Sequence, residues 1–166
     1  KPINLGVIGC GQRSQGHLKC LGVVPQIRVV ALADVHEPSL AAALQMVPAA
    51  TTFRDYGDLL EMDEVEAVLI AAPNFLHAEI AVAALAAGKD VFCEKPLATT
   101  VKDCDRLVTA VEQSDRIFYL GFDLRCSPVL QKTRAVIAAG EFGDVRMVSC
   151  RELRLPFLKK VEDWIV

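Results

Sequence analysis

Short apolar segments with the character of buried strands alternate with helix-like segments through the first 120 residues of the chain. The strand-like segments are residues 3–8, 27–33, 51–53, 67–71, 90–93 and 117–120. Consecutive strands that are separated by helices pair in parallel, and the helices then pack on both faces of the sheet. The alternation therefore predicts an α/β fold with a doubly wound parallel sheet.

The pattern changes after residue 120. Residues 128–139 have the character of a helix, and residues 145–155 read as a longer strand with several charges, which is typical of an antiparallel sheet with one solvated face. We therefore expect a first domain over residues 1–120, and the first helix and strand of a truncated α+β second domain over residues 121–166. The second segment is too short to close a core of its own.

Net charge, apolar runs and cysteine spacing limit the kinds of binding partner and metal site that we expect. The 166 residues carry 18 basic and 21 acidic side chains, a net charge of −3, which gives no reason to expect a nucleic acid as partner. The longest unbroken apolar run, residues 80–87, is too short to span a bilayer, so we expect no membrane partner. The six cysteines form no Cys-x-x-Cys pair. We therefore expect no metal site, and a reducing, cytoplasmic compartment.

A glycine-rich turn follows the first strand-like segment. Gly9 allows a tight turn, and Gly11 lets a pyrophosphate approach the backbone, so that the N–H groups of the next helix hold the anion. Gln12 and Arg13 lie at the same turn and are expected to contact the cofactor. The third small position is Ser14 instead of Gly or Ala, which we expect to loosen the contact between helix and strand. The turn predicts a dinucleotide-binding Rossmann domain; the alternative is a plain strand–helix turn.

Asp34 ends the second strand-like segment. An acid at this position can accept hydrogen bonds from both hydroxyls of the adenine ribose, and it repels a 2′-phosphate. No Arg or Lys within residues 35–40 is present to neutralise such a phosphate. NAD is therefore favoured over NADP as the cofactor. The alternative is that Asp34 merely caps the following helix.

Two polar clusters follow the fourth and fifth strand-like segments, in residues 71–77 and 88–98. Ligands of open α/β sheets lie beyond the carboxyl ends of the strands, so both clusters are expected to face the cofactor. Asn74 is also a candidate N-cap for the alanine-rich helix that follows it. Lys95 stands beside Pro96, whose ring restricts its neighbour, and this arrangement suits a positioned charge better than a mobile surface lysine.

The sequence resembles the Gfo/Idh/MocA family of oxidoreductases. The resemblance rests on an ordered set of motifs: Gly9 with Gly11, Asp34, Pro73-Asn74-x-x-His77, Gly88-Lys89, Glu94-Lys95-Pro96 and Arg125-x-x-Pro128. The set extends over nearly the whole chain and is more specific than any one of its members.

The resemblance implies roles for individual residues. Lys95 would lie near the nicotinamide and the substrate, where it orients the reacting hydroxyl or carbonyl and assists proton transfer. Glu94 and Asn74 would contact or position the nicotinamide half of the cofactor. Pro73 and His77 would shape the same crevice.

Alternatives stand beside these roles. His77 can instead lie on the surface of its helix without a role in binding, and Lys95 can be a surface cation at a strand end. Arg125 is expected either to touch the cofactor or substrate, or to form a structural ion pair. His17 is expected at the surface. The resemblance also implies a cis peptide bond before Pro96.

By this resemblance, the chain takes part in hydride transfer between a nicotinamide and a sugar, an inositol or a related polyol. Members of the family also supply a Gly-Gly-containing segment, an Asp and a His from a large second-domain sheet, through which copies associate as a homo-oligomer. The chain ends at Val166, before such a segment, so we expect a truncated product or a piece of a longer chain.

Three competing functions differ in how well they fit. A catalytically inactive dinucleotide-binding or regulatory module is the main alternative. A methyltransferase also uses a glycine turn and an acid after the second strand, but it offers no role for Glu94-Lys95-Pro96. A short-chain dehydrogenase is disfavoured because neither Tyr56 nor Tyr119 is followed four residues later by Lys.

Overall fold

The structure is a computed structural model that describes residues 1–153. The chain divides into two compact units, Lys1–Gly121 and a second unit that begins at Phe122. All residues of the predicted cofactor site except Arg125 belong to the first unit.

Six parallel strands form one sheet in the first unit, in the order β3-β2-β1-β4-β5-β6. The strands are β1 (Ile3–Ile8), β2 (Ile27–Ala33), β3 (Thr51–Phe53), β4 (Ala67–Ile70), β5 (Asp90–Glu94) and β6 (Phe118–Gly121). The order reverses between β1 and β4, because the chain first builds outward to β3 and then returns to the other side of β1. The predicted doubly wound parallel sheet is confirmed, and its switch point is where sheets of this class bind ligands.

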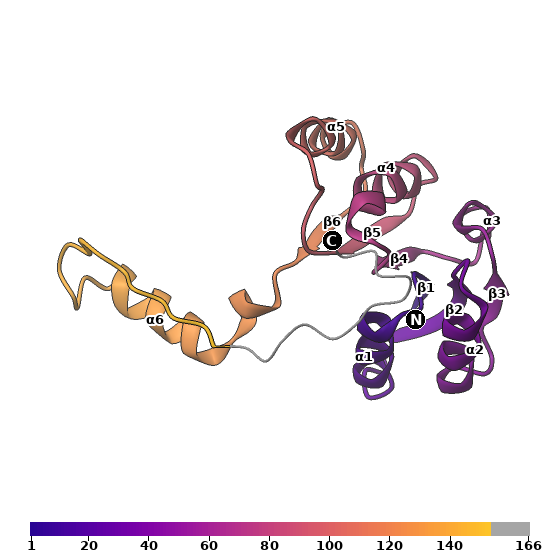
Figure 1. Cartoon of the computed structure of the whole chain (residues 1–166), viewed down its shortest axis with the longest axis horizontal. Coiled ribbons are helices and arrows are strands. Elements are labelled where there is room, and N and C mark those ends of the chain that lie inside the picture. Colours follow the sequence, from indigo (N-terminus) through magenta and orange to yellow (C-terminus); the bar gives the residue numbers. More distant parts are fainter. Residues whose placement is uncertain (154–166) are drawn as a thin grey trace. The chain divides into compact units, whose positions relative to one another are not determined.

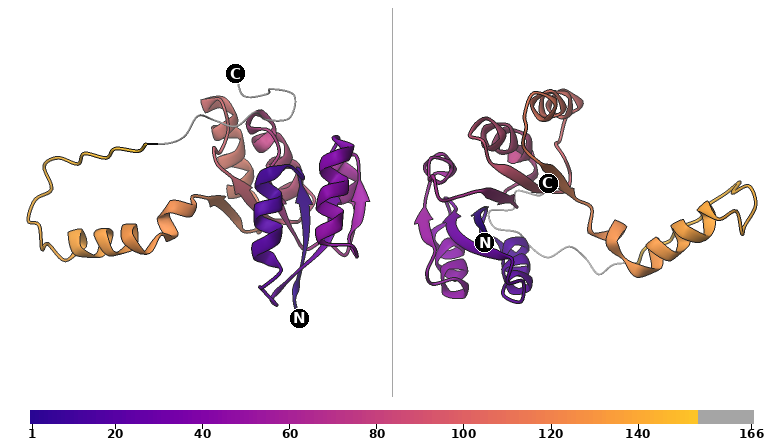
Figure 2. Two further views of the ribbon diagram at one scale, coloured as in Figure 1. Left: turned by 60° about the horizontal axis from the view of Figure 1, so that its bottom comes forward. Right: turned by 180° about the vertical axis from the view of Figure 1, so that it is seen from behind.

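Helices cover both faces of this sheet. They are α1 (Gln12–Leu21), α2 (Glu37–Met46), α3 (Tyr56–Leu60), the 3₁₀ turn η1 (Asn74–Leu76), α4 (His77–Ala86) and α5 (Val101–Glu112). α1 packs beside α2, and α4 packs beside both α3 and α5. Figure 1 shows α1 and α2 together on one face and α4 and α5 on the other, and Figure 2 shows the same separation from two further directions.

The strands of the sheet supply side chains to both layers of the core. In β4, Val68 and Ile70 are buried in one apolar cluster together with Ile80 of α4. Leu69 lies between them in the sequence and belongs to the opposite cluster, together with Leu18 of α1. Successive side chains of a strand point to opposite faces, so a continuous apolar run serves a sheet that is covered on both sides.

Side-chain caps fix where three helices begin. Asp55 caps α3 by accepting a hydrogen bond from the backbone N–H two residues later, at 2.7 Å. Thr100 caps α5 by accepting from the N–H of Asp103 at 3.1 Å. α2 begins after His36, whose ring nitrogen accepts from a backbone N–H in the first turn. Such caps satisfy backbone donors that have no partner within the helix.

The predicted cap at Asn74 is wrong. Asn74 is the first residue of η1, and neither η1 nor α4 has a side-chain cap. The loop after β4 therefore makes a 3₁₀ turn before the α-helix begins at His77. Because of this extra turn, the carboxamide of Asn74 caps neither η1 nor α4.

The second unit contains the 3₁₀ turn η2 (Asp123–Cys126) and the helix α6 (Pro128–Ala138). The helix was expected from the sequence, and Gly140 follows it with a positive φ of 73°. The strand predicted over residues 145–155 is wrong as far as the structure describes it, because residues 145–153 form no strand. Residues 154 and 155, and the end of the chain at Val166, lie outside the described residues. No helix formed by residues 1–153 is long and apolar enough to cross a membrane.

Candidate dinucleotide-binding site

The glycine turn is pressed against the end of β4. Gly9 has a φ of +86°, a conformation that L-residues with a side chain rarely adopt. A Cβ atom built on Gly9 would lie 2.5 Å from the backbone nitrogen of Ala72 and 2.7 Å from the carbonyl carbon of Ala71. Both the backbone angle and the close approach therefore require glycine. The turn after β1 meets the loop after β4 at the switch point of the sheet.

Gly11 differs from Gly9, because nothing in residues 1–153 requires glycine there. Its φ of −68° suits any residue, and beyond its two chain neighbours no atom of these residues lies within 4 Å of the position that a Cβ would take. The open space borders the start of α1, which has no side-chain cap and no acid in its first turn. Backbone N–H groups at such a helix start attract anions. The space and the donors fit the pyrophosphate of a dinucleotide.

Ser14 tightens the contact that it was expected to loosen. Its side chain is fully buried, and its hydroxyl donates a hydrogen bond to the carbonyl oxygen of Gly9. The hydroxyl thus ties α1 to the turn that precedes it. A glycine or alanine at this position would pack as closely but could not make this bond.

Asp34 holds the glycine turn from the end of β2. Its Oδ2 accepts a hydrogen bond from the N–H of Cys10 at 2.6 Å, and its Oδ1 accepts from the N–H of His36 at 2.8 Å. Asp34 is not the cap of α2, since His36 takes that position. Each carboxylate oxygen has two lone pairs. Asp34 therefore retains acceptor capacity for ribose hydroxyls.

The segment after β4 brings together Pro73, Asn74 and His77. His77 does not lie on the helix surface, since it is only 1% exposed. Its Nδ1 lies 2.7 Å from the carbonyl oxygen of Pro96, and its Nε2 lies 3.0 Å from that of Ala72. The ring therefore bridges the loop after β4 and the loop after β5. The side chain of Asn74 is half-buried and makes no hydrogen bond to any of residues 1–153.

Lys95 is the first residue after β5, and it is exposed. Its ammonium has no hydrogen bond or ion pair within the described part of the chain. The peptide bond between Lys95 and Pro96 is cis, as expected. A lysine without an internal partner at the carboxyl edge of the sheet is available to a ligand bound there.

Glu94, the last residue of β5, is buried and contacts α1. Its Oε1 accepts a hydrogen bond from Nε of Arg13 at 2.6 Å and lies 2.8 Å from Nε2 of His17. The structure thus joins two predicted site residues, Arg13 and Glu94, directly. It adds His17, which was expected at the surface. The signal that could have found it is its spacing of four residues from Arg13, which places both side chains on one side of α1.

Two cysteines lie close to the site, and both are protonated at neutral pH. Burial, with a further contribution from the charge of Asp34, raises the pKa of Cys10 to about 12. Burial and the charge of Glu94 raise the pKa of Cys93 to about 12 as well. Because the thiolate is the reactive form of cysteine, both residues serve as small core side chains and not as nucleophiles.

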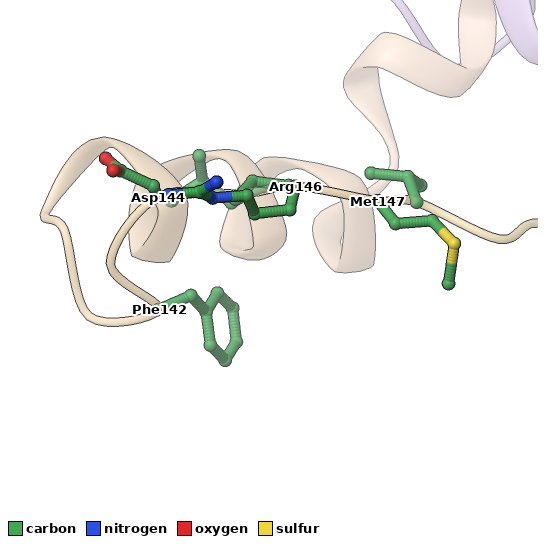
Figure 3. Close-up of a pocket in the computed structure, with 7 residues that line it drawn as sticks. Phe142, Asp144, Arg146 and Met147 are labelled. Atoms are coloured by element: carbon green, nitrogen blue, oxygen red, sulfur yellow. The ribbon is translucent and has the colours of Figure 1, made fainter.

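The second unit holds the remaining predicted residue, Arg125. It is exposed in η2, and its guanidinium lies 4.5 Å from the ring centroid of Phe122, so it stacks on an aromatic ring. The same unit has an open hollow of about 360 Å³ (Figure 3), which contains none of the predicted site residues. The hollow is lined by Ile137, Phe142, Asp144, Val145, Arg146, Met147 and Val148.

A parallel sheet with this strand order, a glycine turn after β1 and an acid after β2 define a dinucleotide-binding Rossmann domain. Residues 3–122 match a family described as an oxidoreductase family with an NAD-binding Rossmann fold. The chain belongs to this family, the Gfo/Idh/MocA family.

The relatives of the chain include inositol dehydrogenases. The inositol 2-dehydrogenases of Salmonella paratyphi B and Pseudomonas fluorescens are 38% and 36% identical to the chain over 152 and 151 residues. These alignments cover 90% and 89% of the chain but 45% of each relative. The chain therefore spans less than half the length of the relatives that it matches.

Solved structures agree on the fold. The myo-inositol 2-dehydrogenase of Lactobacillus plantarum superposes with a TM-score of 0.83 at 26% identity. The scyllo-inositol dehydrogenase of Lactobacillus casei, solved with NAD(H) and scyllo-inositol, superposes with a TM-score of 0.82 at 25% identity. Each superposition covers 87% of this chain and 43% of the other.

The two glycines of the turn predict different outcomes when each is replaced by alanine. Gly9→Ala is expected to lower the free energy of unfolding by at least about 1–2 kcal/mol, because of its positive φ and its contact with Ala72. Gly11→Ala is expected to change that free energy by less than about 0.5 kcal/mol. It should nevertheless weaken NADH binding about tenfold or more, because the methyl group enters the space that fits the pyrophosphate. Urea unfolding and NADH fluorescence titration measure the two effects.

Gly16→Ala is the matched control, because Gly16 is a helical residue of α1 with open space around its Cβ position. It should bind NADH as the parent does. If Gly11→Ala also binds NADH with the parent affinity, the space beside Gly11 does not hold the pyrophosphate.

Proposed function

We propose that the chain is the cofactor-binding part of an NAD-dependent oxidoreductase that transfers a hydride between the nicotinamide and a sugar, an inositol or a related polyol. The observation that carries the proposal is the open space beside Gly11, at the same edge of the sheet as the Lys95 ammonium, which has no partner among residues 1–153. The names of the relatives support a polyol as the substrate class. The free state of all six cysteines supports a reducing, cytoplasmic location.

The N-terminal part of the site would hold the adenosine and the pyrophosphate. Backbone N–H groups at Gly11, Gln12 and Arg13 would bind the pyrophosphate oxygens, and Gly9 and Ser14 would keep the turn in the required shape. Asp34 would accept hydrogen bonds from the ribose hydroxyls. Its negative charge favours NAD over NADP, because a 2′-phosphate at about 4 Å would be repelled by on the order of 4 kcal/mol per pair of unit charges at an effective dielectric constant near 20.

The loops after β4 and β5 would serve the nicotinamide and the reacting carbon. The nicotinamide ring, when bound, supplies the hydride chemistry. Lys95 would donate a hydrogen bond to the reacting hydroxyl or carbonyl oxygen and move a proton at that atom. Asn74 has a side-chain amide with no partner in the described part of the chain, and it suits a contact with the nicotinamide half. Pro73 would shape the same wall, and His77 would keep the two loops together.

The alternative is a dinucleotide-binding or regulatory module without turnover. A contact of Arg125 with the substrate, and association into a homo-oligomer, would matter to the oxidoreductase. A binding module needs neither.

NADH titration combined with a polyol panel distinguishes these functions. The chain is expected to bind NADH more tightly than NADPH, and the complete gene product is expected to oxidise at least one inositol or sugar. Binding without turnover by the complete gene product would favour the module. Preference for S-adenosylmethionine over NADH would overturn both and point to a methyltransferase.

Replacement of Lys95 tests its role in proton transfer. In the complete gene product, Lys95→Ala is expected to lower kcat about 10²- to 10⁴-fold, the range typical for loss of a general acid–base group. The dissociation constant of NADH should change little, because Lys95 faces the reacting oxygen. Lys102→Ala, at an exposed lysine of α5, is the control. Parent-level turnover in Lys95→Ala would remove this residue from the mechanism.

Replacement of Asp34 tests cofactor choice, and the choice of substitution matters. Asp34→Asn keeps a side-chain oxygen for the N–H of Cys10 but removes the charge, so affinity for NADPH should rise about tenfold or more relative to NADH. Asp34→Ala also removes the two backbone contacts and should weaken both cofactors. The two dissociation constants, measured by fluorescence, give the ratio. An unchanged ratio in Asp34→Asn would show that Asp34 does not select the cofactor.

A further inference from the structure

A buried carboxylate joins β5 to α1. The side chain of Glu94 is 5% exposed, and its Oε1 receives both the Arg13 guanidinium and the Nε2 of His17 within 2.8 Å. Burial of a carboxylate is costly unless donors satisfy it. Hydrogen bonds that involve an ionised partner are about twice as strong as neutral ones. The contacts from α1 therefore fix the side chain of Glu94, whose backbone pairs with Gly121 of β6.

The ring of His17 is held in place for this contact. Its side chain is 25% exposed, and the ring meets Phe92 of β5 edge-on, with centroids 5.7 Å apart. Phe92 stacks in turn on Tyr119 of β6, with centroids 5.6 Å apart. Edge-to-face and stacked pairs of this kind contribute beyond their buried area. Phe92 of β5 thus orients the imidazole of His17, and Glu94 of β5 forms the hydrogen bond with its Nε2.

Lys95 follows Glu94 directly in the chain. Its flexible side chain has no partner among residues 1–153. The positions that the Lys95 ammonium can occupy therefore depend on where the backbone of Lys95 is fixed. On one side, the backbone is held by the pairing of Glu94 with Gly121 of β6 and by the side-chain contacts of Glu94 with α1. Pro96, whose carbonyl oxygen lies 2.7 Å from Nδ1 of His77, fixes it on the other.

We propose that His17 is a positioning residue for hydride transfer, which acts with Arg13 through Glu94 to fix the start of the Lys95 side chain. The same helix begins at the glycine turn, so α1 sets the separation between the pyrophosphate site and Lys95. The inference rests on the proposed function, since it requires Lys95 to act on the reacting oxygen. His17 itself contacts Glu94 and Phe92 and has no direct part in the chemistry.

A matched pair of variants separates the hydrogen bond from the packing. His17→Phe removes the donor to Glu94 but keeps an aromatic ring against Phe92. His17→Gln returns a side-chain N–H donor. Lys19→Ala, at an exposed residue of the same helix, is the control. Urea unfolding of each variant first establishes that it is folded.

Three quantities are then measured for the parent and each variant of the complete gene product. They are kcat with a polyol, the NADH dissociation constant, and the rate of amide hydrogen exchange in residues 94–98. His17→Phe is expected to lower kcat about tenfold to a hundredfold, as displacement of a positioned group does, with less than about a threefold change in NADH affinity. Exchange in residues 94–98 should become faster. His17→Gln should recover most of the kcat and the slow exchange, and Lys19→Ala should match the parent.

The outcomes separate this inference from the proposed function. If the parent turns over a polyol and His17→Phe keeps its kcat, the positioning role is overturned while the oxidoreductase stands. If the parent binds NADH without turnover, the oxidoreductase fails, and a role for His17 in hydride transfer fails with it. Faster exchange in His17→Phe would then still establish the contact through Glu94 as a structural one. A His17→Gln variant that behaves like His17→Phe would also contradict the hydrogen-bond account.

Discussion

The close approach of Gly9 to the backbone of Ala71 and Ala72 is the constraint on which the site depends. Because a Cβ on Gly9 would lie 2.5 Å from the nitrogen of Ala72, the turn after β1 and the loop after β4 can meet only if this residue is glycine. They meet at the switch point of the sheet, directly before the start of α1. Asp34 and Ser14 then hold the turn by hydrogen bonds to Cys10 and Gly9.

The three segments of the site are linked in pairs. Gly9 packs on the end of β4, His77 bridges that loop to Pro96 after β5, and Glu94 of β5 returns to Arg13 on α1. The two polar links use buried side chains, His77 and Glu94. The described residues contain no buried side-chain nitrogen or oxygen without a partner. A fully satisfied polar network of this kind rigidifies its surroundings. Asn74 and Lys95, whose side chains have no partner among residues 1–153, are groups that we propose to meet the ligand.

The sequence was sufficient for the fold, because the strand alternation and the glycine turn are local signals. It also pointed to the loops after β1, β4 and β5 that meet in the structure, whereas the roles of their residues toward a cofactor stay predictions. It failed where the outcome depended on which elements meet in space. His17 has the sequence context of a surface residue, and only the packing of α1 against β5 brings it to Glu94. Ser14 departs from the usual small residue, yet its hydroxyl finds the carbonyl of Gly9. The strand expected over residues 145–155 has the right composition, but a strand needs a neighbour, and residues 122–153 provide none.

A crystal structure of the chain with saturating NADH tests the central claim most directly. The account predicts electron density for the pyrophosphate beside Gly11 at the start of α1, ribose hydroxyls within hydrogen-bonding distance of Asp34, and the nicotinamide on the side of Asn74 and Lys95. Density for the pyrophosphate elsewhere, or side chains filling the space beside Gly11 while the cofactor is bound at another place, would contradict it.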